Sequence, residues 1–157
     1  MLKISKKASV NLSIIISALF YLALVFVGVI MPKVIFSMLV ISNNIVEIPL
    51  SSNTEEIIVI ALAYIILAFA LLANTLCMLL LLQVKKENVF SKKCIGLIRG
   101  ISWCAIAVGI FFAAMGIFVP LTFVVAVAAL FLGLCVRVVK NVIEKATEIK
   151  SENDLTV

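Results

Sequence analysis

The sequence predicts an all-α integral membrane protein: a four-helix bundle with both termini in the cytoplasm and a cytoplasmic amphipathic extension of its fourth helix. Three observations support this. Hydrophobic residues make up 65% of the 157 residues and charged residues only 13%, which is more apolar surface than a small water-soluble core can bury. The apolar stretches are long and do not alternate with polar residues, so they favour helices over strands. Almost all basic residues lie before the first apolar stretch, between the second and the third, or at the end of the fourth and beyond it.

Residues 10–31 form the first predicted span. Lys3, Lys6 and Lys7 precede it, as in a secretory signal peptide. The apolar run is longer than the roughly 7–15 residues of a signal peptide, however, and no small-residue cleavage site follows, so we expect the span to be retained. Pro32 lacks a backbone donor and disfavours helical geometry in the residue before it. It therefore predicts where the first helix leaves the bilayer.

Residues 33–53 are predicted to be the outer connection. Their middle part is apolar, but polar residues between 42 and 47 interrupt it, and it is too short to cross a bilayer by itself. An interfacial segment and a re-entrant segment both fit. The second predicted span, residues 57–82, would be about 39 Å long at about 1.5 Å per residue. We therefore expect it to tilt or to protrude into the cytoplasm.

The connection 83–99 is predicted to be a basic cytoplasmic loop. Within it, Ser91 is a candidate helix N-cap, because its hydroxyl can accept a hydrogen bond from the first turn. Phe90 would then pack on Ile95 as a hydrophobic staple. The two lysines that follow Ser91 occupy the first turn, where the helix dipole disfavours cations by roughly a few tenths of a kcal/mol. We expect orientation in the membrane to outweigh so small a cost.

The third helix is predicted to run from Ser91 to about Gly116, with residues 101–118 as its span. An uncharged outer turn, Gly116 to Pro120, leads to the fourth span, residues 121–139. Small residues recur four apart in both helices, a spacing that lets helices approach closely. They are Ala105, Gly109 and Ala113 in the third helix and Ala129 and Gly133 in the fourth. We expect them to pack helices within the chain, and a homodimer face is the alternative.

Residues 137–157 are predicted to form a cytoplasmic helix that ends in a polar tail from Ser151. At about 100° per residue, its apolar residues fall within about 140° and its polar residues lie opposite. The apolar stripe consists of Val138, Val139, Val142, Ile143, Ala146 and Ile149, and the polar side of Lys140, Asn141, Glu144, Lys145, Thr147 and Glu148. Such a stripe would lie on lipid headgroups, pack beneath the bundle or receive a cytoplasmic partner.

The distribution of charge predicts the orientation. Of the 13 Lys and Arg residues, three precede the first span, five lie between the second and third spans, and four lie at the end of the fourth span or beyond it. Only Lys33 falls on the other side. Counted over short connections, this bias predicts cytoplasmic termini and an even number of spans.

Composition argues against several kinds of binding and catalytic site. The net charge is +5, but the basic residues lie beside apolar spans without interleaved aromatics, so we expect no direct nucleic-acid binding. The chain has no histidine, and its four cysteines, Cys77, Cys94, Cys104 and Cys135, lack Cys-x-x-Cys spacing. We therefore predict no metal site, no cofactor and no catalytic residue. The cysteines are expected to be small apolar fillers.

Two groups of residues are candidates for binding. Asn74 and Thr75 are the most polar side chains deep in a span. They would contact a substrate or ion or, in the interpretation we favour, form an interhelical hydrogen bond worth about 0.6 kcal/mol. Candidate contacts to a partner or to lipid headgroups are Lys85, Lys86, Phe90, Lys92, Lys93, Arg99, Arg137, Lys140, Val142, Ile143 and Ile149.

Two stretches resemble a known family. They are Val89-Phe90-Ser91 leading to Leu97-Ile98-Arg99-Gly100-Ile101-Ser102-Trp103, and Arg137-Val138-Val139-Lys140-Asn141-Val142 running into Glu152-Asn153-Asp154-Leu155-Thr156-Val157. Both are similar to the bacterial membrane-protein family catalogued as domain of unknown function 2975. The resemblance implies a four-span inner-membrane protein without assigned activity. Family members are often encoded beside a small helix-turn-helix repressor of the Cro/C1 type, which implies a regulatory pairing.

The sequence thus favours a non-enzymatic protein of the cell (inner) membrane that acts through interaction. Its partners would be the lipid bilayer and a cytoplasmic helix-turn-helix transcription regulator, bound through the basic loop and the C-terminal helix. The alternative is a small transporter or permeation element that works as a homo-oligomer. The predicted spans contain no charged residue except Arg137, which lies at the cytoplasmic end of the fourth, and this disfavours a proton-coupled transporter. An enzyme comes third, because no pair of nucleophile and base is visible.

Overall fold

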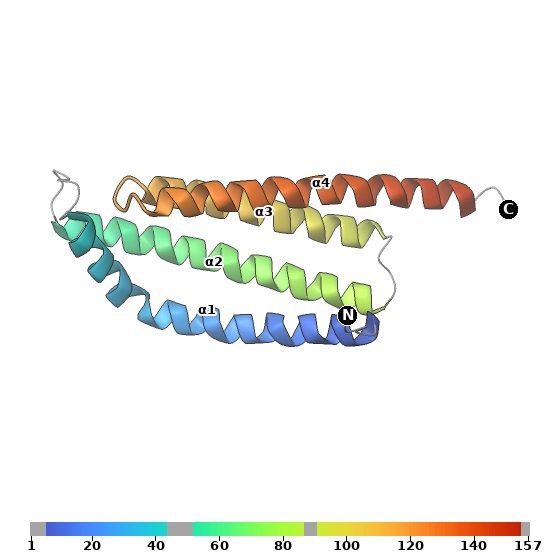
Figure 1. The fold of residues 1–157 in the computed structure, drawn as a ribbon, viewed down its shortest axis with the longest axis horizontal. Coiled ribbons are helices and arrows are strands. Elements are labelled where there is room, and N and C mark those ends of the chain that lie inside the picture. The colour runs from blue at the N-terminus through green and yellow to red at the C-terminus, as the bar shows by residue number, and fades with distance from the viewer. Residues whose placement is uncertain (1–5, 44–51, 87–90, 155–157) are drawn as a thin grey trace, which may run out of the picture.

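The structure contains four helices and, among the residues that it describes, no strand. It is a computed structural model that describes residues 6–43, 52–86 and 91–154. The helices are α1 (Lys6–Asn43), α2 (Ser52–Lys85), α3 (Lys92–Met115) and α4 (Thr122–Asp154), drawn in Figure 1. All four are long and apolar enough to cross a membrane. The all-α class and the four candidate spans are therefore confirmed.

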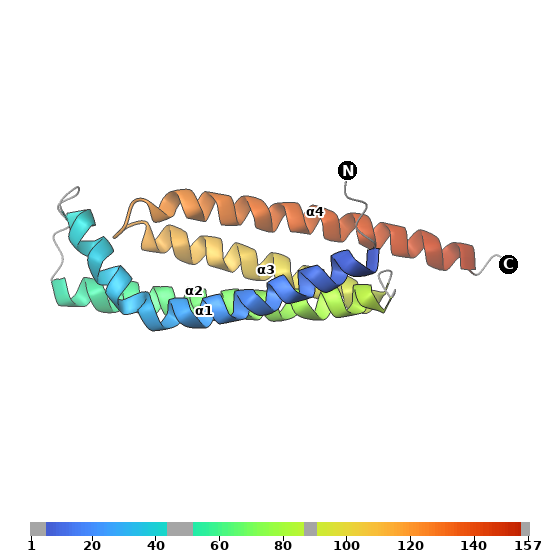
Figure 2. The same ribbon diagram turned by 60° about the horizontal axis from the view of Figure 1, so that its bottom comes forward.

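The helices lie in a row in chain order. α1 packs on α2, α2 on α3, and α3 on α4, and within the described ranges no other pair of helices brings Cα atoms within 8 Å of each other. Figure 1 shows α1 and α4 at opposite edges, and Figure 2 shows α3 between α4 and α2 from a second side. The sequence predicted a bundle, in which the first and last helices would also meet. Acyl chains cover apolar side chains as well as a neighbouring helix does, so no hydrophobic force closes the row.

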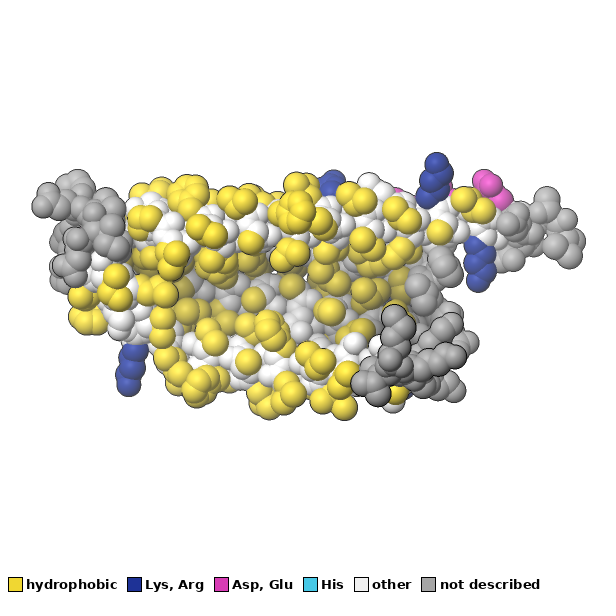
Figure 3. Space-filling model, in the orientation of Figure 1, with side chains coloured by type: hydrophobic (Ala, Val, Ile, Leu, Met, Phe, Trp, Pro, Cys, Tyr) yellow, Lys and Arg dark blue, Asp and Glu magenta, His cyan; other side chains and the backbone are white. Residues whose placement is uncertain are grey.

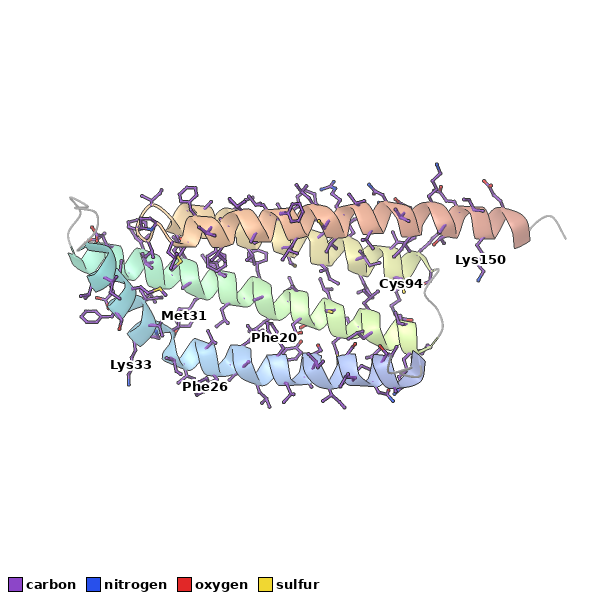
Figure 4. The ribbon with its side chains drawn as sticks, viewed as in Figure 1. Phe20, Phe26, Met31, Lys33, Cys94 and Lys150 are labelled. Atoms are coloured by element: carbon purple, nitrogen blue, oxygen red, sulfur yellow. The ribbon has the colours of Figure 1, made fainter. Side chains whose placement is uncertain are left out.

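The two ends of the molecule differ in charge. The N-terminal end of α1 and the C-terminal end of α4 lie at the same end as the α2–α3 connection (Figure 1). We call this the basic end, and the opposite one, which holds the turn between α3 and α4, the turn end. Figure 4 places Lys33 at the turn end, and Cys94 and Lys150 at the basic end. Which end faces the cytoplasm stays a prediction.

α1 does not stop at Pro32. The helix contains this proline and continues to Asn43, with a bend that Figure 2 shows. Proline removes one backbone hydrogen bond and crowds the preceding turn, which kinks a helix without always ending it. The continuation is held because Ile35 and Leu39 are buried in an apolar cluster with residues of α2 and the turn end. The predicted outer connection is therefore helical in its first part, and residues 44–51 lie outside the described residues.

α3 begins and ends where the sequence predicts. Ser91 is the N-cap, and its Oγ accepts a hydrogen bond from the backbone N of Cys94 at 3.3 Å. Gly116 is the C-cap. The predicted hydrophobic staple involves Phe90, which lies outside the described residues.

α3 and α4 approach closely through small residues. A Cβ added at Gly109 would lie 3.1 Å from the backbone N of Leu130, and one added at Gly133 would lie 3.2 Å from the backbone N of Ile106. The two backbones therefore nearly touch at both glycines. Ser102 Oγ also donates a hydrogen bond to the carbonyl oxygen of Gly133 at 2.9 Å. The small residues thus pack within the chain, as expected.

Most of the apolar surface faces outward. In the most apolar 18-residue window of α1 only 6% of the residues are buried, and in those of α2 and α4 17%. Figure 3 shows hydrophobic side chains over most of the visible face. Soluble monomers do not leave contiguous apolar area of this extent in water. The chain is therefore a multi-pass membrane protein.

Candidate functional site

Asn74 and Thr75 both reach toward α1. Asn74 is 9% exposed. Its Nδ2 donates to the carbonyl oxygen of Ser17 at 3.2 Å, and its Oδ1 accepts from Ser17 Oγ at 3.0 Å. Thr75 donates to the carbonyl oxygen of Leu71 at 2.8 Å, so the hydroxyl of Tyr21, which contacts Thr75 Oγ1, is the donor in that pair. Both side chains are engaged in joining α1 to α2.

Four basic residues lie near the α2–α3 connection, and each of them is exposed. Lys85 and Lys86 lie at the C-terminal end of α2, and Lys92 and Lys93 form the first turn of α3. All four side chains are exposed. Cations placed in this way agree with a role in membrane orientation, which requires charge at the membrane end and no particular geometry.

Arg99, Arg137 and Lys140, by contrast, come together between α3 and α4. They line a cavity of about 80 Å³, which we call the basic cavity. Its other lining residues are Ser102, Trp103 and Asn141. Two neighbouring helices therefore bring three cations, one aromatic ring and two polar side chains to one place.

The contacts around the basic cavity involve one carboxylate. Glu144 pairs with Lys140 and also with Arg99, whose guanidinium nitrogen is 3.5 Å from the Glu144 carboxylate. The side chain of Lys140 is only 13% exposed, whereas that of Arg99 is 58% exposed. The guanidinium carbon of Arg137 lies 5.0 Å from the centre of the Trp103 ring, which is a cation–π contact.

Lys140 and Arg99 lower the pKa of Glu144, which lies beyond the predicted fourth span. The hydrogen bond from Lys140 is the main cause that lowers the pKa of Glu144 below its ordinary value of 4.5. Desolvation by burial opposes it, and the charges of Lys140 and Arg99 lower the pKa further. Because folding lowers this pKa, the stabilisation by the pairs is present above about pH 4.5 and is lost as the pH falls through the folded value. At neutral pH Glu144 is therefore a carboxylate.

The C-terminal half of α4 turns its polar side, not its apolar stripe, toward α3. Glu144 on that side pairs with Arg99 of α3. Ile143, at the margin of the predicted stripe, is half-buried. The other large members are exposed: Val138 by 62%, Val139 by 52%, Val142 by 63% and Ile149 by 52%. We call Val138, Val142 and Ile149 the outward stripe. This placement disagrees with the interpretation in which the stripe packs beneath the bundle.

Sequence reasoning missed three residues of the basic cavity, namely Ser102, Trp103 and Asn141. A signal was present for two of them. Trp103 lies four residues after Arg99, and Asn141 four residues after Arg137, so each pair shares one face of its helix. The sequence does not tell how α3 and α4 are rotated about their axes, and this rotation decides which faces meet.

Glu55 is another residue whose environment the sequence did not indicate. It precedes the predicted second span, lies in the first turn of α2 and is 3% exposed. Its Oε1 has no hydrogen-bond partner among the described residues. Within the described part of the chain, no group of three His, Cys, Asp or Glu side chains is placed to hold a metal ion.

The comparisons with known proteins agree with the resemblance noted in the sequence. The family model described as Protein of unknown function (DUF2975) matches residues 7–157, essentially the whole chain. This match confirms the family suggested by the stretches that begin at Val89 and at Arg137. A search of the curated proteins and a search of the solved structures gave no match.

Proposed function

Since the chain belongs to the family described as Protein of unknown function (DUF2975), a description that names no activity, we propose its function from its own geometry. The protein is a multi-pass membrane protein that acts by binding a second protein and not by catalysis. The binding surface is the outward stripe of α4. The partner is a cytoplasmic transcription regulator of the helix-turn-helix type.

The observation that carries this proposal is the direction in which α4 faces. Its polar side is used within the chain, through the pairs of Glu144 with Arg99 and Lys140, and its apolar side is left open. The three side chains of the outward stripe are each more than half exposed. Burying one such side chain completely is worth about 1.5–3 kcal/mol. A partner that covers Val142 and Ile149, the two residues farther along the helix, would therefore gain part of the free energy of a specific complex.

Depth in the membrane distinguishes a protein partner from lipid. Val142 lies 20 residues and Ile149 27 residues after Thr122, the first residue of α4, which corresponds to about 30 Å and about 40 Å of helix. The hydrocarbon core of a bilayer is about 30 Å thick. If Thr122 lies at one boundary of this core, Val138, about 24 Å along the helix, still lies inside it, whereas Val142 reaches the other boundary and Ile149 lies beyond it. Acyl chains do not cover an apolar side chain there.

The spacing of the outward stripe suits a groove in a protein partner. Val138 and Val142 are separated by one helical turn, and Ile149 follows two turns later on the same side. Amphipathic helices bind protein grooves through side chains spaced in this way. The charge bias predicts that this part of α4 is cytoplasmic, and the family resemblance implies a regulator encoded nearby. These two considerations support the regulator as the partner.

The proposal that the protein is not an enzyme is supported by the use of its polar groups. Ser102 donates its hydroxyl hydrogen to the carbonyl oxygen of Gly133. Glu144 is paired with two cations. A catalytic centre needs a nucleophile and a base within reach of each other and of a substrate, and these groups are instead committed to the contact between α3 and α4.

Co-purification with the helix-turn-helix regulator that the family resemblance implies tests the proposal. The triple substitution Val138→Ser, Val142→Ser and Ile149→Ser removes most of the apolar area of the outward stripe, so we expect regulator retention to fall by roughly tenfold or more. The control is Lys145→Ser with Glu148→Ser, which alters two exposed residues of the same helix without changing the net charge. It should leave retention unchanged. Failure of the unaltered protein to retain the regulator would refute the proposal.

A further inference from the structure

The surroundings of Lys140 differ from those of a lysine that serves only orientation. A lysine at a membrane end normally extends its ammonium group into water. The side chain of Lys140 is instead only 13% exposed. Its Nζ lies beside the Glu144 carboxylate and 3.4 Å from Asn141 Oδ1. Its charge is therefore held at the wall of the basic cavity.

The basic cavity carries an excess of positive charge. Arg99, Arg137 and Lys140 all line it, and Glu144 is the carboxylate that pairs with two of them. Arg137 lies over the ring of Trp103 and has no carboxylate partner among the described residues. Three cations, of which Lys140 is largely buried, thus face one anion. Repulsion between the cations would be relieved by a bound anion.

The size of the basic cavity limits what that anion is. A volume of about 80 Å³ corresponds to two or three water molecules at about 30 Å³ each. Cavities that enclose a whole drug-sized molecule measure about 300–1,000 Å³. The basic cavity therefore admits a group of the size of a phosphate, and the remainder of a larger ligand would stay outside.

The position along the helices indicates the source of the phosphate. Arg99 lies 16 residues before Met115, the last residue of α3, and Arg137 lies 15 residues after Thr122. These separations correspond to about 24 Å and about 22 Å of helix. With the turn end at one boundary of a hydrocarbon core of about 30 Å, the long side chains of both arginines reach the opposite boundary. Lipid phosphates lie there, and tryptophan is enriched at that level.

The geometry points to the basic cavity as a binding site for the phosphate group of an anionic lipid. Arg99, Arg137 and Lys140 donate hydrogen bonds to the phosphate oxygens, as cations between transmembrane helices do in headgroup sites. Trp103 borders the site and contacts the adjoining part of the lipid. This inference goes beyond the proposed binding of a regulator, because it concerns the space between α3 and α4 and not the outward stripe.

Trp103 provides a direct readout, because it is the only tryptophan of the chain. The full-length protein is reconstituted in phosphatidylcholine vesicles that contain increasing fractions of brominated phosphatidylglycerol or, separately, brominated phosphatidylcholine. Bromine quenches tryptophan fluorescence at close range, so the two titrations give the relative affinity of the two headgroups beside Trp103. We expect a clear preference for phosphatidylglycerol.

Two matched double variants test whether the preference for phosphatidylglycerol arises at the basic cavity. Arg99→Gln with Lys140→Gln removes two cations from the basic cavity, and the preference should fall by roughly fivefold for each cation removed. Lys85→Gln with Lys93→Gln removes the same charge from exposed positions at the basic end and should change the preference by less than about twofold, because exposed charges are screened. The charge-preserving change Lys140→Arg should keep the preference and also tests whether the cavity tolerates substitution.

Equal quenching by the two brominated lipids in the unaltered protein would overturn the inference, and so would an equal decrease of the preference in the two double variants. Inorganic phosphate, compared with potassium chloride of the same ionic strength, separates the two sources of the anion. Failure of inorganic phosphate to relieve quenching by brominated phosphatidylglycerol supports a lipid. Relief of quenching would overturn the lipid as the source, because the cavity would then bind soluble phosphate.

Discussion

Individual hydrogen bonds fix how α1 and α2 are rotated against each other. Ser17 and Asn74 exchange two hydrogen bonds, and Tyr64 donates to the carbonyl oxygen of Gly28 at 3.3 Å. Apolar side chains alone would allow several rotations of nearly equal free energy, because lipid covers whichever face is left open. The polar contacts select one of them.

This interpretation predicts a measurable coupling between Ser17 and Asn74. In a double-mutant cycle of Ser17→Ala and Asn74→Leu, we expect a coupling free energy of about 0.6 kcal/mol and no more than about 1.7 kcal/mol. Unfolding of the purified protein in detergent measures it. Ser13→Ala is the control, because Ser13 Oγ bonds to the carbonyl oxygen of Ser9 in its own helix, and its effect should add to that of Asn74→Leu. Simple additivity in both cycles would contradict the structural role of Asn74.

The sequence identified only half of this contact. Asn74 was conspicuous because an amide deep in an apolar span is costly unless it is hydrogen-bonded. Ser17 was not, because a serine hydroxyl can bond to its own helix, as Ser13 does. Which of the small polar residues of α1 faces α2 depends on the packing of the two helices.

At the scale of the helices, the pair formed by α3 and α4 has the closest contact described. Its glycines permit this contact because neither carries a Cβ at the crossing. Gly109 faces Leu130, and Gly133 faces Ile106. The basic cavity lies one to two turns from Gly133, so the distance between the cations from the two helices depends on the same contact.

Substitution at two glycines of α3 should have opposite effects. In Gly109→Ala the new Cβ would lie 2.7 Å from Leu130 Cγ and 3.1 Å from its backbone N, so we expect the free energy of unfolding to fall by about 1–3 kcal/mol. Gly96→Ala is the matched control, because nothing lies within 4 Å of its added Cβ. It should stabilise α3 by up to about 1 kcal/mol. Denaturant unfolding in detergent measures both. A Gly109→Ala protein as stable as Gly96→Ala would show that the helices are not in contact there.

α1 shows how a local rule and a tertiary contact compete. Pro32 favours the end of a helix, and the sequence alone placed the exit from the bilayer there. The structure keeps the helix and bends it instead, because Ile35 and Leu39 gain burial against other elements. The close packing of these two side chains against α2 and the turn end compensates for the loss of one backbone hydrogen bond.

For the whole molecule, four helices that run back and forth place the N-terminal end of α1 and the C-terminal end of α4 at the basic end. We predict that this end is cytoplasmic, because 12 of the 13 Lys and Arg residues precede the first span, lie between the second and third, or lie at the end of the fourth or beyond it. A periplasmic reporter enzyme should be inactive when fused after Val157 and active when inserted after Ile117, in the turn between α3 and α4. Activity of the C-terminal fusion would contradict the predicted orientation.

The four apolar helices, the bounds of α3 and the separation of charge between the two ends follow from the amino-acid sequence. These features depend on the transfer of apolar side chains into lipid and on hydrogen bonds within a few residues, as at Ser91. Packing between the helices sets their order in a row, the pairing of Ser17 with Asn74, the convergence of Arg99, Arg137 and Lys140, and the outward direction of Val142. A membrane helix is apolar on all sides, so its sequence does not reveal which side faces a neighbour. That choice is made where small residues and polar pairs let two particular helices fit together.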